Sequence, residues 1–159
     1  MAKKQMTHLD EQGAARMVDV GGKAVTERVA VAEGELRMSA ETRLLLFSGK
    51  SRKGDALAAA RIAGIMAAKN TASLIPLCHP LALSSIDIDI EEVARPSAAR
   101  VRATVKLAGK TGVEMEALTA VSVALLTLYD MLKSVQRDMR IERVRLRHKS
   151  GGRSGTINQ

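Results

Sequence analysis

Aromatic residues are almost absent from this chain of 159 residues: it has no tryptophan, one phenylalanine and one tyrosine. Apolar residues still make up 46% of it, so a core must be built from Ala, Leu, Ile, Val and Met. The length suits one domain. Proteins that bind RNA or single strands on a sheet usually stack bases on aromatic side chains. No strand expected below carries one, which argues against a nucleic-acid partner.

Cysteine is equally scarce. Cys78 stands alone, so an intrachain disulfide and a disulfide-rich secreted scaffold are excluded. The first residues are basic but lack the apolar stretch of a secretory signal. The most apolar segment, 117–132, is interrupted by polar residues and falls short of the roughly 20 apolar residues that span a bilayer. We therefore expect a cytoplasmic protein with no membrane partner.

Positive charge is in excess. Lys and Arg number 25 against 17 Asp and Glu, a formal charge of +8. Residues 133–153 hold eight basic and two acidic side chains, so this segment alone carries 8 − 2 = +6. A second basic cluster is formed by Lys50, Arg52 and Lys53. Such clusters attract a nucleic acid, an acidic surface or a phosphorylated small molecule, or they only solvate the protein.

The first half of the chain predicts one strand and two helical segments. Residues 25–37 alternate well enough for a strand, and a short helical turn is expected at 40–47. Asp55 is a plausible N-cap for a helix of small residues over 56–69. Gly64 within that helix would allow close helix packing.

The second half predicts three strands and a long helix. Residues 86–93 and 101–108 both alternate across the short turn 95–100, which favours an antiparallel pair with one wet face. A helix is expected over 113–137 and a last strand over 140–148. In that strand two apolar residues face inward and three arginines face outward: Val144 and Leu146, then Arg143, Arg145 and Arg147.

This order of elements predicts an α+β fold. It is the ferredoxin-like βαββαβ arrangement, an antiparallel sheet with helices packed on one face. We expect a single domain over 1–159, with a loosely ordered N-terminus at 1–16 and a glycine-rich mobile tail at 150–159.

The long helix carries four candidate chemical groups. Asp130 and Lys133 are three residues apart on one face, which suits either a surface ion pair or an acid–base couple. Glu114 and Glu116 lie where carboxylates favour a helix start, or where they could act on a substrate. Glu116 and Asp130 lie within roughly 40° around the axis but ~21 Å apart along it. If both serve one pocket, they come from different subunits.

Two loops add further candidates. Cys78 and His79 stand between prolines, either as a buried pair or with His79 as proton donor or phosphate ligand. No second Cys/His pair has zinc-ligand spacing, so no metal site is expected. The GKTG turn at 109–112 lacks the first glycine of a P-loop, because Thr104 stands there. It remains a modest anion site at a helix start.

Several segments together resemble one family, that of the cyclic pyranopterin monophosphate synthases, protein C of molybdenum cofactor biosynthesis. The likeness extends from about Thr7 to Gly155. The matching segments are MVDV (17–20), KGDALAAARIAGI (53–65), LIPLCHPL (74–81), GKTGVEMEALTAVSVALLTLYDM (109–131), LKSVQRDM (132–139) and KSGGRSG (149–155).

The resemblance implies a fold, an assembly and a reaction. Family members are ferredoxin-like homohexamers, trimers of dimers with active sites at dimer interfaces. They are phosphorus–oxygen lyases that use general acid/base chemistry and no cofactor. Their substrate is a purine triphosphate, 3′,8-cyclo-7,8-dihydro-GTP, and their products are cyclic pyranopterin monophosphate and pyrophosphate.

The resemblance also implies site residues. Asp130 matches the general acid/base, and Lys133 and Lys53 match catalytic lysines. The residues that match substrate contacts are Leu77, Cys78, His79, Met115, Glu116, Glu114 and Lys149. Two other hypotheses stay open: a basic ferredoxin-like nucleic-acid-binding module without catalysis, and a non-catalytic interaction subunit.

Overall fold

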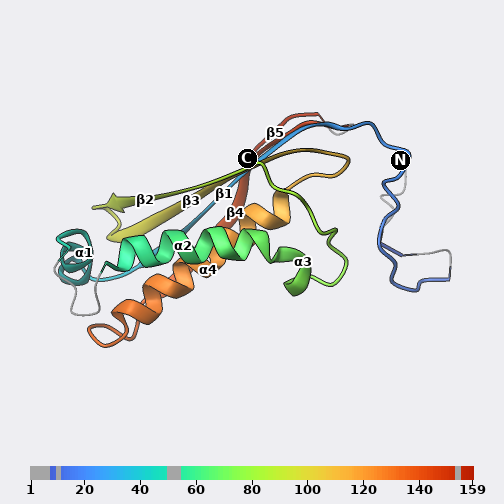
Figure 1. Ribbon diagram of the computed structural model, residues 1–159. Coiled ribbons are helices and arrows are strands. Elements are labelled where there is room, and N and C mark those ends of the chain that lie inside the picture. Colours follow the sequence, from blue (N-terminus) through green and yellow to red (C-terminus); the bar gives the residue numbers. More distant parts are fainter. Residues whose placement is uncertain (1–7, 10–11, 50–54, 153–154) are drawn as a thin grey trace.

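The computed structural model describes all residues except 1–7, 10–11, 50–54 and 153–154. Helices cover one face of an antiparallel sheet, so the expected α+β, ferredoxin-like class is confirmed (Figure 1). The elements in chain order are β1 (Thr26–Arg37), α1 (Ala40–Phe47), α2 (Ala56–Lys69), α3 (Thr71–Leu74), β2 (Ser85–Val93), β3 (Ala98–Gly109), α4 (Glu114–Leu132), β4 (Arg140–Ser150) and β5 (Ile157–Asn158).

The sheet has the order β2-β3-β1-β4-β5, and every pairing in it is antiparallel. β1 is central: it pairs along its whole length with β3 and, less regularly, with β4. β3 lies between β1 and β2, as in a split βαβ unit. The start of β1 and the ends of β3 and β4 therefore lie at the same end of the sheet, where Thr26 is opposite Gly109 and Val29 is opposite Ser150.

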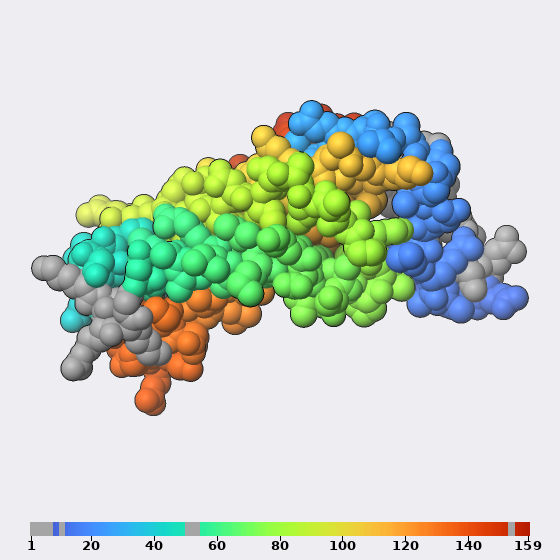
Figure 2. All heavy atoms as spheres, in the orientation of Figure 1, coloured from blue at the N-terminus to red at the C-terminus, as the bar shows by residue number. Residues whose placement is uncertain are grey.

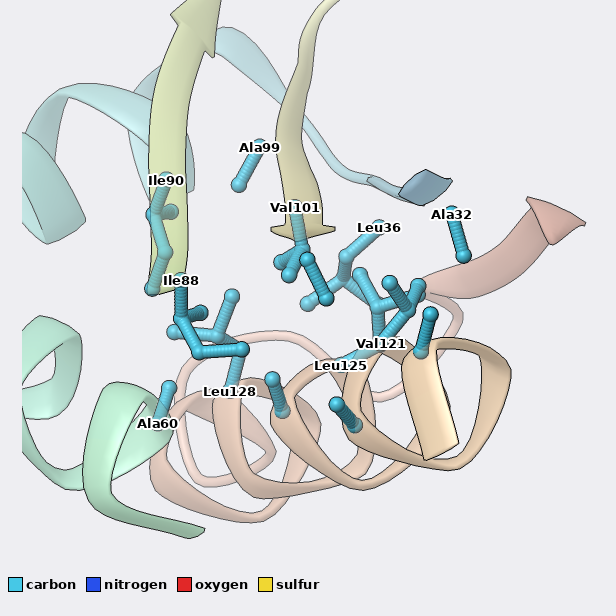
Figure 3. Packing of buried hydrophobic residues seen from close by; sticks show 14 of the residues in the cluster. Ala32, Leu36, Ala60, Ile88, Ile90, Ala99, Val101, Val121, Leu125 and Leu128 are labelled. Atoms are coloured by element: carbon cyan, nitrogen blue, oxygen red, sulfur yellow. The ribbon is translucent and has the colours of Figure 1, made fainter. Parts of the chain in front are cut away.

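The core lies between this sheet and the two long helices. Ala32 and Leu36 of β1 face Val121 and Leu125 of α4, and all four are fully buried (Figure 3). Small side chains let α2 approach α4 closely: a Cβ added at Gly64 would lie 3.1 Å from a backbone oxygen of α4. The predicted packing role of this glycine is confirmed. Asp55 caps α2 as expected, accepting from the Ala58 amide at 2.9 Å.

By length and composition α4 is apolar enough to cross a membrane, although the interrupted segment 117–132 predicted otherwise. Buried helices of folded domains are often equally long and apolar. One face of α4 packs in the core, and 44% of the apolar window is buried. Packing on the sheet and on α2 accounts for the buried apolar face of α4.

The long helix ends earlier than predicted, at Leu132 instead of residue 137. The chain turns there: the Val135 amide donates to the Leu132 carbonyl at 2.8 Å. The Tyr129 hydroxyl donates to the Arg137 carbonyl at 2.7 Å and ties the turn back to the helix. β3, in contrast, begins earlier than predicted, at Ala98: Ala98 already pairs with Arg37 of β1 and Val93 of β2, and Ala99 is fully buried in the core.

β4 departs from regular alternation. Its pairing with β1 shifts register twice, and Arg143 adopts a positive φ of 58°. Val144 points to the helix side, as expected, but remains 38% exposed because the strand is irregular there. Arg145 and Arg147 face the other side of the sheet, where both lie near Glu33.

Both chain ends contain local structure that no pattern indicated. In the tail, β5 pairs with β4, and His148 Nδ1 lies 2.7 Å from the Asn158 side-chain oxygen. Near the N-terminus, Leu9 and Ala15 form an isolated antiparallel bridge. The segment that follows this bridge runs across one end of the molecule (Figure 1).

Candidate active site

Two adjoining cavities lie at the N-terminal end of α4. The first, about 380 Å³, is bounded by segment 77–79 and by the start of α4. The second, about 720 Å³, is bounded by Arg28, Lys110 and Lys149. Both are lined by Lys23, Thr111, Gly112 and Glu114, so they form one continuous site with two halves.

The first half is built from the loop between α3 and β2. A backbone bond from the Cys78 amide to the Ile75 carbonyl, 3.1 Å, folds the start of this loop into a turn. The Ser84 amide then donates to the Lys106 carbonyl at 2.9 Å and anchors the loop to β3. Leu77, Cys78 and His79 are thereby brought beside the start of α4.

Two carboxylates from the first turn of α4 enter the site. Glu116 is only 4% exposed, and this burial raises its pKa. A hydrogen bond from its own backbone amide lowers the pKa, while the charge of Glu114 raises it further. Glu114 lies at the boundary between the two halves and accepts from Lys149 Nζ at 2.5 Å. The first half therefore holds a carboxyl group prone to protonation beside one that is ion-paired.

Cys78 and His79 complete this half. Burial raises the pKa of the Cys78 thiol, and the charge of Glu116 adds to this shift. The thiol is therefore kept in its neutral form and is poorly suited to act as a nucleophile. His79 Nε2 lies 3.0 Å from the Val18 carbonyl oxygen.

The second half is cationic around Arg28. This side chain is 9% exposed and donates to the carbonyls of Gly109 and Lys110, both at 3.3 Å. Within the described part of the chain no carboxylate forms an ion pair with it. Gly152, at a positive φ of 74°, packs directly on the guanidinium, where any Cβ would collide. A buried cation without an acidic partner is costly unless an anion joins it, so this half suits a phosphate-bearing ligand.

Asp130 and Lys133 lie at the opposite end of α4. Their side chains are 2.6 Å apart and more than half exposed. The hydrogen bond with Asp130 raises the pKa of Lys133, and the negative charge of Asp130 acts in the same direction. Lys133 lines a separate cavity of about 340 Å³ with Tyr129 and Arg137. One protomer therefore does not bring this pair to the pocket, since a helix rises 1.5 Å per residue and roughly 21 Å separate Glu116 from Asp130.

Two further expectations concern Lys53 and metal binding. Lys53 lies outside the described residues. Within the described ranges, no group of three or more His, Cys, Asp or Glu side chains lies close enough to hold a metal ion.

Sequence reasoning missed the N-terminal wall and the buried arginine. Val18, Val20 and Lys23 line the site, yet they belong to a polar, glycine-containing segment without periodicity. Arg28 did carry a usable signal. It shares the alternation phase of Ala30, which faces the helices, and a charge at an inward strand position is unusual.

The chain matches the model of the MoaC family over residues 17–152. It is also 57% identical over 155 residues to cyclic pyranopterin monophosphate synthase of Parvibaculum lavamentivorans, with 98% of this chain and 97% of the relative covered. The matched range 17–152 spans both halves of the site, from the segment at 17–23 to the end of β4. The chain therefore belongs to the MoaC family.

Proposed function

We propose that this protein is a cyclic pyranopterin monophosphate synthase of molybdenum cofactor biosynthesis. It converts 3′,8-cyclo-7,8-dihydro-GTP into cyclic pyranopterin monophosphate and pyrophosphate. The observation that carries the proposal is the presence of a buried cation, Arg28, and a buried carboxyl group, Glu116, in two halves of one site; no carboxylate among the described residues pairs with Arg28. A nucleotide-derived substrate has a matching division into a polyanionic end and a base end.

The triphosphate occupies the cationic half. Arg28 supplies a fixed guanidinium, and Lys23 and Lys149 add ammonium groups. Lys53 is proposed to join them. When a sugar hydroxyl attacks the α-phosphorus, the bond from that phosphorus to the pyrophosphate oxygen breaks. The cations then stabilise the charge that develops on the departing pyrophosphate.

The base end occupies the half that contains the carboxylates. Glu114 and Glu116 accept paired N–H donors from the guanidine-like edge of the base. Leu77 and Met115 contact the ring system, and His79 serves as a proton carrier near it. Cys78 contributes a neutral, packed wall.

Asp130 and Lys133 reach this site from a second copy of the chain. Asp130 acts as general acid/base, tuned by the adjacent ammonium group of Lys133. The separation of roughly 21 Å along α4 supports this division between subunits. We propose a cytoplasmic homohexamer, a trimer of dimers, with each site at a dimer interface.

Turnover tests the reaction. Purified protein is mixed with 3′,8-cyclo-7,8-dihydro-GTP, and pyrophosphate is measured together with the pterin product, by fluorescence after oxidation. We expect one pyrophosphate per pterin. Arg28→Met should abolish turnover, whereas Arg61→Met, on an exposed face of α2, should not. Substrate that remains unchanged in the presence of the wild-type protein would overturn the proposal, and salt-dependent oligonucleotide binding would then support the nucleic-acid-binding alternative.

Mixing two inactive variants tests the shared site. Asp130→Asn and Arg28→Met each remove one contribution, so each alone should be inactive while still assembling. Random mixing in equal amounts restores about a quarter of the sites, because a complete site needs one wild-type half from each of two subunits. Mixed oligomers, identified by native mass spectrometry, that stay inactive would show that both residues act from one subunit.

A further inference from the structure

The segment 17–23 forms a wall of the site without being part of the sheet. Val18, Val20 and Lys23 are half-buried and line the cavities, while Met17 and Asp19 are exposed. The segment thus has one side toward the pocket and one toward solvent. Figure 2 shows the blue N-terminal stretch lying against the green and yellow-orange segments that follow α3 and β3.

This wall is held by side chains and not by a strand ladder. Of the described hydrogen bonds, two join residues 17–23 to the rest of the protein: Lys110 Nζ donates to the Gly21 carbonyl at 2.7 Å, and His79 contacts the Val18 carbonyl. The other two are internal, from the Gly21 amide to Asp19 at 2.7 Å and from the Lys23 amide to the Val20 carbonyl at 3.1 Å. A segment attached so sparsely opens at low free-energy cost.

We propose that residues 17–23 are a strap that closes over the pocket and orients His79, and that Lys110 is the positioning residue that holds the strap down. The proposal deepens the proposed function, on which its catalytic part rests. Lys110 is suited to this role because it extends from the turn after β3, and the guanidinium of Arg28 fixes that turn through the Gly109 and Lys110 carbonyls. The clamp is therefore built on the same turn that leads into α4.

The strap also decides which ring nitrogen His79 presents to a ligand. A carbonyl oxygen only accepts hydrogen bonds, so Nε2 at 3.0 Å from the Val18 oxygen must carry the proton. Neutral His79 then has its lone pair on Nδ1, and the proton it exchanges with a substrate moves at Nδ1. Release of the strap removes this constraint, so strap closure and the protonation geometry of His79 are coupled.

Lys110→Met tests the clamp, because it removes the ammonium donor and keeps an apolar stem of similar reach. In the substrate-free protein, hydrogen exchange of the amides in 17–23 should accelerate roughly tenfold, since a hydrogen bond from a charged donor is lost. Exchange in α4 should be unchanged. The ¹⁵N shifts of the His79 ring should move from the Nε2–H tautomer toward a mixture. Lys110→Arg should restore both properties.

Lys106→Met is the matched control, since Lys106 is an exposed lysine of β3. In steady-state turnover we expect Lys110→Met to raise KM at least several-fold more than it lowers kcat. Unchanged exchange in 17–23 together with unchanged His79 shifts would overturn the strap, whatever the turnover. Hydrogen exchange and the His79 shifts are both measured without substrate, so they test the strap even if the proposed reaction is wrong.

Discussion

At the scale of single residues, Glu116 combines burial with a chemical role. Burial raises its pKa, and the neighbouring Glu114 charge contributes in the same direction. The unfolded chain has an ordinary glutamate value of 4.5. The stability that Glu116 contributes is therefore complete below that value and is lost as pH rises through the higher folded-state pKa. At neutral pH the site is maintained at some cost to the fold.

Replacement of Glu116 by Gln should separate stability from activity. At pH 8 we expect the free energy of unfolding of the variant to exceed that of the wild type by on the order of 1 kcal/mol. The variant should also lose turnover. Near pH 4 the stability difference should shrink, because the wild-type carboxyl is then protonated. Urea unfolding at both values measures this, with Glu27→Gln on an exposed part of β1 as control. A variant less stable than wild type at pH 8 would contradict the assignment of burial as the cause.

The candidate residues were predictable from sequence where local order alone brings them together. Leu77, Cys78 and His79 are consecutive, and Glu114 and Glu116 share one helical turn, so their grouping survives in the structure. Lys23 was not predictable, because its place in the pocket depends on a segment with no regular structure. Residue patterns report periodic elements and say little about a strap held by side-chain bonds.

At the scale of elements, α4 lies unusually close to β1 at Gly34. A Cβ added there would lie 2.8 Å from a methyl group of Leu125, and 3.0 Å from methyl groups of Val121 and Val144. Three side chains from two elements surround the position, so no single one can move away freely. No local sequence pattern predicts this crowding, because it comes from α4 and β4, which are distant in the chain.

Gly34→Ala should therefore destabilise the fold by about 1–3 kcal/mol through overpacking. Gly22→Ala is the matched control, since a Cβ at Gly22 meets nothing within 4 Å. The control should change stability by less than about 0.5 kcal/mol. Urea unfolding of both variants gives the comparison, and equal stabilities would mean that α4 moves away from the sheet without cost.

The types of most elements were predictable, but the end of α4 and the irregular course of β4 were not. Alternation in 86–93 and the apolar run through α4 are local signals, and both elements formed. The end of α4 depends on the Tyr129 hydroxyl reaching a carbonyl eight residues later, and the irregular course of β4 depends on the positive φ at Arg143. Neither feature changes the hydrophobic periodicity of the sequence, so neither could be predicted from it.

At the scale of the whole molecule, ion pairs link neighbouring strands on the face of the sheet opposite the helices. Glu33 of β1 accepts from Arg145 of β4 at 2.8 Å, with Arg102 of β3 and Arg147 of β4 nearby. Burial alone would raise the pKa of Glu33, but the hydrogen bond from Arg145 and the surrounding positive charges outweigh it and lower the pKa. The stability from this network is therefore present above the ordinary value of 4.5 and is lost as pH falls through the lowered one.

Glu33→Gln should cost about 1 kcal/mol at pH 7, a modest value because solvent screens the half-exposed Arg145. The difference from wild type should vanish in acid, below the pKa of the folded carboxyl. Thermal unfolding between pH 2 and 7 measures it. If the stability difference between wild type and variant persisted at pH 2, the effect would come from side-chain packing and not from the charge of Glu33.

The central position of β1 has a consequence for synthesis of the chain. β1 leaves the ribosome first, but its two partners are encoded far downstream, as the pairings Thr26 with Gly109 and Val29 with Ser150 show. Until β3 and β4 emerge, the nascent strand has no sheet to join and both its edges stay open to other chains. Any premature termination before β4 thus releases a polypeptide with one edge of its middle strand unpaired, a natural substrate for chaperones and proteases.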